Sequence, residues 1–109
     1  MHKIYLACPY SDPNPAVCER RTIEADKMAA KLMAQGNIVY SPLSGSHRIA
    51  HHMDNHLDHD FWLNQDLAFI DWADEIVVLD LPGARQSRGI ARELEHAKKR
   101  GIPVRWITT

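Results

Sequence analysis

Two glutamates near the end of the chain stand two positions apart, and their spacing predicts different environments. In a helix of 100° per residue, Ile90, Leu94 and Ala97 form an apolar stripe. Glu93 lies about 60° from the centre of this stripe and Glu95 about 140° from it, so Glu93 borders the buried face. It is either a boundary residue whose stem packs on the core while its carboxylate reaches water, or an ionisable group that faces a pocket.

The pattern of residues 61–73 predicts a helix, and on this helix Asp66 lies between two groups of apolar residues. One apolar arc consists of Leu63, Leu67 and Ile70, and the other of Trp62, Phe69 and Ala73. A carboxylate between such neighbours is either capped by hydrogen bonds or shifted toward protonation by desolvation. We therefore expect either a structural aspartate that bonds the backbone of a loop, or an acid or orienting group that lines a pocket.

Ser87, Arg88 and Gly89 follow a predicted strand and begin a predicted helix. The free amides and the dipole of a helix N-terminus bind anions, and the arginine adds a cation, so these residues can hold a phosphate. The segment contains neither G-x-x-x-x-G-K-[ST] nor G-x-G-x-x-G, which leaves an ordinary helix cap as the alternative.

Histidines gather in one polar stretch of the chain, residues 47–59, with aspartates beside them. The histidines are His47, His51, His52, His56 and His59, and the aspartates are Asp54, Asp58 and Asp60. Some of these histidines have the spacing of metal ligands on a helix, yet H-E-x-x-H is missing and no cysteine is nearby. We expect a polar loop that covers a pocket and holds no metal, in a protein that needs no cofactor.

The cysteines and the overall composition narrow the class of protein. No histidine or asparagine has a recognisable spacing to Cys8, so we expect Cys8 beside the core rather than as a nucleophile. With Cys18 as the other cysteine, and no C-x-x-C or signal peptide, we expect reduced thiols in a cytoplasmic protein. The formal charge of −1 favours neither a nucleic acid polymer nor a membrane surface as a partner. No apolar segment approaches the roughly 18 residues of a membrane-spanning helix.

Short apolar runs alternate with longer segments of helical period along all 109 residues. The pattern predicts strands at 3–8, 37–42, 74–82 and 102–108, helices at 12–36, 61–73 and 87–100, and a polar stretch without a clean period at 43–60. We expect one domain, 1–109, with a parallel sheet of four to five strands in a small Rossmann-like or flavodoxin-like three-layer sandwich.

Ligands in such sheets bind at the carboxyl ends of the strands. Here we expect that edge to contain residues 7–11, 41–47 and 80–89 and the tail that follows Ile107. His47 and Asp80 are therefore candidate substrate-binding residues.

Four segments carry a resemblance to a known family. In chain order they are IYLACPYS, SPLSGSH, NQDLAFIDWADEIVVLDLPG and SRGIARELEHAKKRGIPV. Together they resemble the nucleoside 2-deoxyribosyltransferase superfamily, in particular a small branch of it, and they are similar to the 2'-deoxynucleoside 5'-phosphate N-hydrolases. The resemblance implies that Glu93, in an S-x-G-x-x-x-E segment, is the nucleophile that attacks the anomeric carbon. It also implies that Asp66, in a Q-D-L segment, works beside Glu93 and that Tyr5 on the first strand assists.

The resemblance also implies substrate contacts. In the phosphate-using relatives, the serine and glycine that correspond to Ser87 and Gly89 contact the 5'-phosphate. Relatives often have a glycine-containing first turn where this chain reads ACPYS, and we take Pro9, Tyr10 and Ser11 as candidate substrate contacts.

The implied function is the cleavage or exchange of an N-glycosidic bond in a small-molecule nucleoside or nucleotide. The alternative is a non-catalytic nucleotide-binding or sensing module of the same fold, and a third possibility is a metal-dependent hydrolase that uses the histidine-rich stretch. Hydrolysis and base transfer differ only in whether water or a free base attacks. Because Trp62, Phe69 and Trp72 place aromatic surface on several sides of one helix, we also expect a homo-oligomer.

Overall fold

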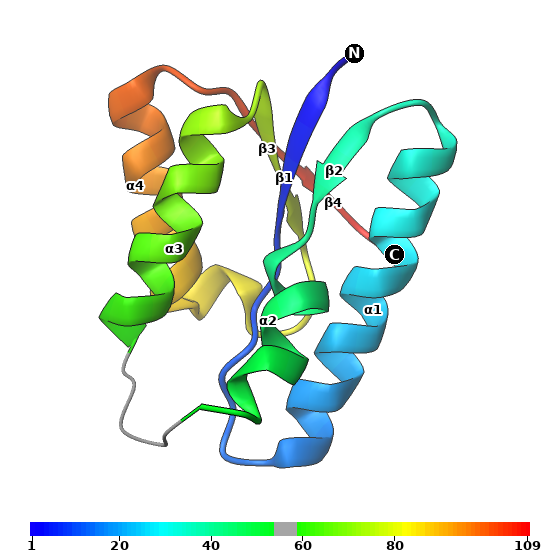
Figure 1. Cartoon of the computed structure of the whole chain (residues 1–109), viewed down its shortest axis with the longest axis vertical. Coiled ribbons are helices and arrows are strands. Elements are labelled where there is room, and N and C mark those ends of the chain that lie inside the picture. The colour runs from blue at the N-terminus through cyan, green and yellow to red at the C-terminus, as the bar shows by residue number, and fades with distance from the viewer. Residues whose placement is uncertain (54–58) are drawn as a thin grey trace.

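Four parallel strands form the centre of the molecule in the order β2-β1-β3-β4 (Figure 1). The computed structural model describes residues 1–53 and 59–109. The strands are β1 (Lys3–Ala7), β2 (Ile38–Tyr40), β3 (Glu75–Leu79) and β4 (Val104–Ile107). This order is flavodoxin-like, and it confirms the predicted fold class with four strands in the sheet.

Helices cover both faces of the sheet, α1 and α2 on one face and α3 and α4 on the other (Figure 1). They are α1 (Pro15–Ala34), α2 (Pro42–Ala50), α3 (His59–Trp72) and α4 (Arg88–Arg100), with a short 3₁₀ helix, η1 (Ala84–Gln86), before α4. Asn14 caps α1 and Ser87 caps α4 through their side-chain oxygens, so α1 begins three residues later than the predicted start at residue 12 and α4 begins one residue after its predicted start. In the described part of the chain, no helix is both long and apolar enough to cross a membrane.

Alternate residues of the two central strands face two separate cores. Ile4 and Leu6 of β1 face α1, where Ala25, Met28, Ala29 and Leu32 are buried. Met33, the next residue of α1, is 51% exposed, because it lies at the side of the helix and one residue from its end. Tyr5 and Ala7 face α3 and α4 instead, so Tyr5 points toward the two helices that carry Asp66 and Glu93.

The stretch predicted as a polar loop begins with a helix, α2, and that part of the prediction is wrong. Pro42 occupies the first turn of α2, where a missing amide costs nothing, and is buried. Leu43 packs on the core beside α1. The half-buried residues of α2, which are Leu43, Ser46, His47 and Ala50, have helical spacing, but only Leu43 and Ala50 are apolar, so hydrophobic periodicity does not reveal this helix. The remaining residues of the predicted loop at 54–58, which include His56, lie outside the described residues.

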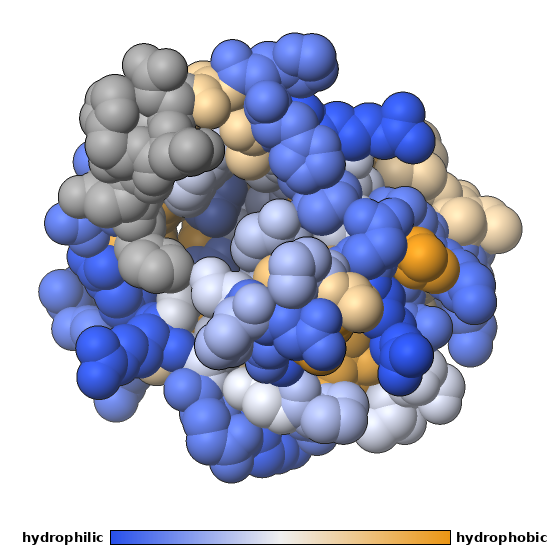
Figure 2. Space-filling model, turned by 90° about the horizontal axis from the view of Figure 1, so that it is seen from below, coloured by the Kyte–Doolittle hydropathy of each residue, from blue (hydrophilic) through white to orange (hydrophobic). Residues whose placement is uncertain are grey.

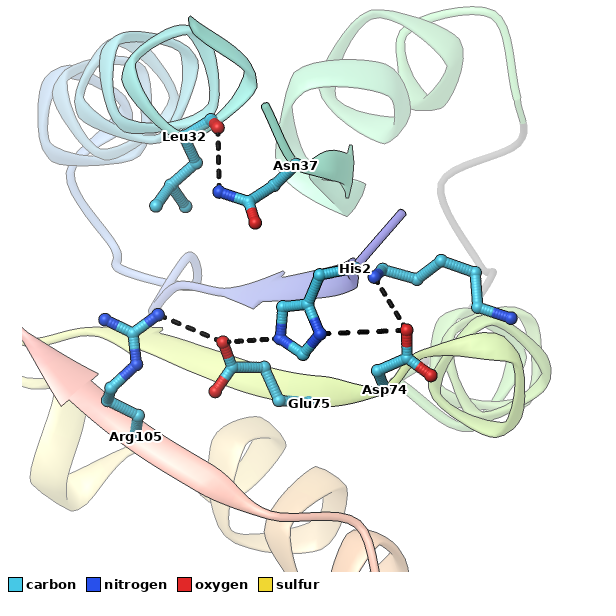
Figure 3. Close-up of polar contacts among 7 residues, drawn as sticks. His2, Leu32, Asn37, Asp74, Glu75 and Arg105 are labelled. Atoms are coloured by element: carbon cyan, nitrogen blue, oxygen red, sulfur yellow. Dashed lines mark hydrogen bonds and ion pairs between the residues drawn. The ribbon is translucent and has the colours of Figure 1, made fainter. Parts of the chain in front are cut away.

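A polar cluster joins three strands at the amino edge of the sheet (Figure 3). Glu75 Oε1 accepts hydrogen bonds from Arg105 Nη2 and His2 Nε2, each at 3.0 Å. Although burial acts to raise it, the pKa of Glu75 is lowered by these hydrogen bonds and by the charges of both partners. Asp74 accepts from the Lys3 amide at 2.9 Å, which ties the start of β1 to β3.

Candidate active site

Tyr5, Asp66 and Glu93, which come from β1, α3 and α4, meet on the α3–α4 side of the sheet. The Tyr5 hydroxyl donates a hydrogen bond to Glu93 Oε2. Asp66 lies close enough to this hydroxyl for its charge to raise the pKa of Tyr5. The structure therefore brings together the three residues for which the sequence predicted a catalytic role, although they are 27 to 88 positions apart along the chain.

The two neighbouring glutamates of α4 have opposite surroundings. Glu93 is 7% exposed, whereas the side chain of Glu95 is 68% exposed and pairs with Lys99 one turn along the helix at 3.6 Å. This confirms the prediction that Glu93 borders the core and that Glu95 points to water. The carboxyl of Glu93 does not reach water as a boundary residue does; it ends at the Tyr5 hydroxyl.

Burial sets the electrostatics of the three groups. It raises the pKa of Glu93 from 4.5 to about 8, with the charge of Asp66 acting in the same direction. It also raises the pKa of Asp66 from 3.8 to about 6, although the hydrogen bond with Tyr5 opposes this rise. The pKa of Tyr5 is raised by its burial and then by the two carboxylates. The site therefore disfavours a second negative charge, and the carboxyl pair retains a proton at neutral pH.

Tyr40 is a site residue that the sequence analysis missed. Its ring stacks on that of Phe69 with centroids 3.9 Å apart and lies 6.0 Å from the ring of Tyr5. Burial raises the pKa of Tyr40, and the charge of Asp66 raises it further. Its position in the sequence could have indicated this role, because Tyr40 is the last residue of a strand, and ligands bind at the carboxyl ends of strands in such sheets.

The loop that follows β1 contacts α1 and α2 through a chain of hydrogen bonds. The Tyr10 hydroxyl bonds His47 Nδ1 at 2.8 Å, and His47 Nε2 bonds Glu19 Oε2 at 2.8 Å. Pro9 is buried and Ser11 is exposed. The structure thus brings Tyr10 and His47 together, as two of the predicted substrate-binding residues, and adds Glu19 as their neighbour.

Arg21 connects the loops that follow β1 and β3, another arrangement that the sequence analysis missed. Its Nη1 donates to the carbonyls of Tyr10 and Ser11 at 3.2 and 3.1 Å, and its Nη2 donates to the carbonyl of Pro82 at 3.0 Å. Gly83 has a φ of +92°, and a Cβ there would lie 2.7 Å from Arg21 Nη2. The glycine is needed both for its backbone conformation and for the close approach of the guanidinium.

The predicted substrate-binding residues that follow β3 lie in two places. Asp80 lines a cavity, whereas Ser87, Arg88 and Gly89 lie at the start of α4. Asp80 pairs with Arg85 at 3.0 Å, and the Arg85 guanidinium lies 4.2 Å from the ring centroid of Trp106. A cavity of about 250 Å³ is lined by Asp80, Leu81, Pro82, Gly83, Arg85 and Gln86. Tyr5, Asp66 and Glu93 are not among the described residues that line it.

At the start of α4, the Ser87 hydroxyl already takes part in a hydrogen bond, whereas the next two residues are exposed. Ser87 Oγ accepts from the Ile90 amide at 3.2 Å, which makes Ser87 the helix cap. Arg88 and Gly89 are exposed at the first turn. Figure 2 looks onto this carboxyl edge of the sheet and shows a mostly hydrophilic surface with a hollow on one side.

Two further predictions concern thiols and metals. Cys8 is buried, and burial raises the pKa of its thiol to about 12, so the prediction that it lies beside the core is confirmed. The rings of His47 and His51 contact each other with centroids 5.0 Å apart. Within residues 1–53 and 59–109, no three histidine, cysteine, aspartate or glutamate side chains are grouped to hold a metal ion.

Two solved structures share this fold over nearly the whole chain. One is the 2-deoxyribosyltransferase of the psychrotolerant bacterium Bacillus psychrosaccharolyticus, with 25% identity, a TM-score of 0.67, and coverage of 97% of this chain and 72% of that one. The other is a 2-desoxiribosyltransferase from Leishmania mexicana, with 18% identity and a TM-score of 0.66. The match covers 100% of this chain and 65% of that one. The second likeness concerns the fold alone.

Family models give a second comparison. The model described as "Domain of unknown function (DUF1937)" matches residues 2–108. No curated protein matches the chain. With the sheet order, the covered length and the family match in agreement, the chain belongs to the DUF1937 family, and its fold belongs to the nucleoside 2-deoxyribosyltransferase-like superfamily.

Proposed function

We propose that the protein cleaves or exchanges the N-glycosidic bond of a nucleoside or nucleoside 5'-monophosphate, with Glu93 as the nucleophile. The observation that carries the proposal is the buried Glu93 carboxyl bonded to the Tyr5 hydroxyl, with Asp66 close enough for its charge to act on both groups. The likeness to a 2-deoxyribosyltransferase supports a deoxyribosyl substrate.

A buried carboxylate suits attack on an anomeric carbon. The transition state of glycosyl transfer has oxocarbenium character, so positive charge develops next to the attacking group. A carboxylate removed from water interacts strongly with that charge, and it is less solvated and more nucleophilic than an exposed one. Glu93 meets this requirement, whereas the exposed Glu95 does not.

In this proposal Tyr5 lies between the two carboxyls, so that one of them can act as the nucleophile and the other as the acid. A phenol oxygen donates one hydrogen bond and can accept another, so Tyr5 bonds both carboxyls when the pair holds one proton. The higher pKa of Glu93 places this proton mainly on Glu93, and the reactive form arises when the proton moves to Asp66, because the Tyr5 hydroxyl then donates to an ionised Glu93. The same network then contains a nucleophile and an acid, with no change in net charge.

The first half of the reaction follows from this state. Glu93 forms a bond to the anomeric carbon while the bond between this carbon and the base nitrogen breaks. The electron pair stays with the base, which takes the proton of Asp66. In the second half, water or another base attacks the same carbon, returns a proton to Asp66, and releases Glu93.

The 5'-phosphate, where present, binds at the first turn of α4 in this proposal. The exposed Arg88 and the free amides of the helix supply the charge, while Ser87 keeps its capping role. We also expect a homo-oligomer, because Phe69 and Trp72 expose much of their apolar surface on α3.

The test is incubation with nucleosides, 2'-deoxynucleosides, their 5'-monophosphates and NAD, with and without an acceptor base, followed by chromatography. We expect a free or exchanged base with the wild-type protein, none with Glu93→Ala, and wild-type release with Glu95→Ala as the matched control. Equal release by the wild type and Glu93→Ala contradicts the assignment of the nucleophile. Tight binding of nucleotides without any base release identifies a binding module instead of an enzyme.

A further inference from the structure

The ring of Tyr40 lies between β1, the strand that carries Tyr5, and α3, the helix that carries Asp66. It is the Cα partner of Tyr5 across the β1–β2 ladder, so the two side chains leave neighbouring strands on the same face of the sheet. Its ring is nearly parallel to that of Phe69, at an angle of 10°. Phe69 follows Asp66 by three residues on α3, which places both on one face of the helix, one turn apart.

The stack docks the part of α3 that presents Asp66. Farther along the helix, Ile70 and Ala73 are buried against the sheet. At its first turn, Asp60 pairs with Arg92 of α4 at 2.8 Å, but both of these side chains are largely exposed. In the middle turn, Leu67 packs on the core, and Phe69 makes the contact with β2 through its stack on Tyr40. An aromatic pair of this kind contributes about 0.5–1.5 kcal/mol beyond its buried area.

We propose that Tyr40 is a positioning residue, whose ring holds the Asp66 turn of α3 over Tyr5 and keeps water from the carboxyl pair. The inference rests on the proposed function for its catalytic meaning. Among the described residues, the titratable groups that face Asp66 are Tyr5 on β1, Tyr40 on β2 and Glu93 on α4. The influence of the Asp66 charge on both phenols agrees with a carboxyl held close to the two rings.

The substitutions separate the ring of Tyr40 from its hydroxyl. Tyr40→Phe keeps the stack and removes only the hydroxyl, whereas Tyr40→Leu removes the stack. Phe69→Leu breaks the same stack from the helix side. Trp72→Leu is the matched control, since Trp72 is a partly exposed aromatic residue at the end of α3 whose ring lies near Lys3.

The measurement is the titration of the Asp66 carboxyl by carbonyl NMR, together with kcat and KM as functions of pH. Because lost packing admits water, we expect the pKa of Asp66 to fall by about one pH unit or more in Tyr40→Leu and Phe69→Leu. We expect kcat to fall about tenfold or more in both with a smaller change in KM, since a misplaced group impairs chemistry more than binding. Tyr40→Phe and Trp72→Leu should keep the wild-type titration and kcat.

An unchanged Asp66 titration in folded Tyr40→Leu overturns the proposal, as does a rise in KM alone, which would make Tyr40 a substrate contact. If Tyr40→Leu does not fold, as judged by circular dichroism, the titration of Phe69→Leu decides the question in the same way. The titration needs no substrate. A wild-type protein that releases no base therefore contradicts the proposed function, while the placement of Asp66 by Tyr40 is still supported or overturned by NMR.

Discussion

Replacing Glu93 by glutamine should change how the stability of the fold depends on pH. In the folded protein the pKa of Glu93 is raised from 4.5 to about 8, so the protonated carboxyl is the form that the fold favours. The stabilisation is present in full below pH 4.5 and is lost as the pH rises through about 8. At about 1.4 kcal/mol for each pH unit between the two pKa values, the loss amounts to roughly 5 kcal/mol, a large part of the stability of a small domain.

Glu93→Gln keeps a carbonyl oxygen that can accept from Tyr5 but has no charge to gain. We expect the free energy of unfolding of the wild type to fall between pH 5 and pH 9 by several kcal/mol more than that of Glu93→Gln. Urea unfolding followed by tryptophan fluorescence at pH 5, 7 and 9 measures this difference. Glu95→Gln, at the exposed position, should follow the wild-type curve. Parallel curves for the wild type and Glu93→Gln would refute the electrostatic reasoning about the buried site.

Three other outcomes follow from particular contacts. Gly83→Ala should lower the free energy of unfolding by roughly 1–3 kcal/mol, because residue 83 has a positive φ and the added Cβ meets Arg21. Gly45→Ala, whose Cβ would lie in open space on α2, should not destabilise the protein, and equal melting temperatures for the two variants contradict this reasoning. Arg88→Ala should reduce any preference for a 5'-monophosphate over its nucleoside by about ten- to a hundredfold in calorimetry, and an unchanged preference removes the proposed phosphate contact. Cys8 should resist iodoacetamide at pH 8 in the folded protein, as checked by mass spectrometry, and rapid modification contradicts its burial.

Local pattern was enough to predict the layers of the fold. The strands are short apolar runs bounded by breakers, and the helix caps Asn14 and Ser87 carry the side chains that accept from free amides. Helical spacing predicted that Glu93 borders the buried face of α4, which Ile90 and Ala97 define, but it left open whether the carboxyl reaches water. These features depend on residues within a few turns of one another.

The parts that sequence reasoning missed depend on partners far away in the chain. Tyr40 stacks on Phe69, 29 positions later, and neither residue has a local pattern that reveals the other. Arg21 is held by backbone carbonyls, which every residue has, so its partners leave no mark in the sequence. The helix α2 likewise depends on a neighbour, because Leu43 packs on the core that the buried residues of α1 help to form.

The polar cluster at the amino edge has a practical consequence for handling the protein. His2, Glu75 and Arg105 join the start of β1 to β3 and β4 at the edge of the sheet opposite to the loops after β1 and β3 (Figure 3). A surface anchor placed at this amino edge therefore projects away from the proposed active site. The carboxyl end of β4 lies at the other edge, where the Ile107 carbonyl accepts from the Asp80 amide at 2.8 Å. Immobilisation through the amino edge is thus the arrangement that leaves the proposed substrate side open to solution.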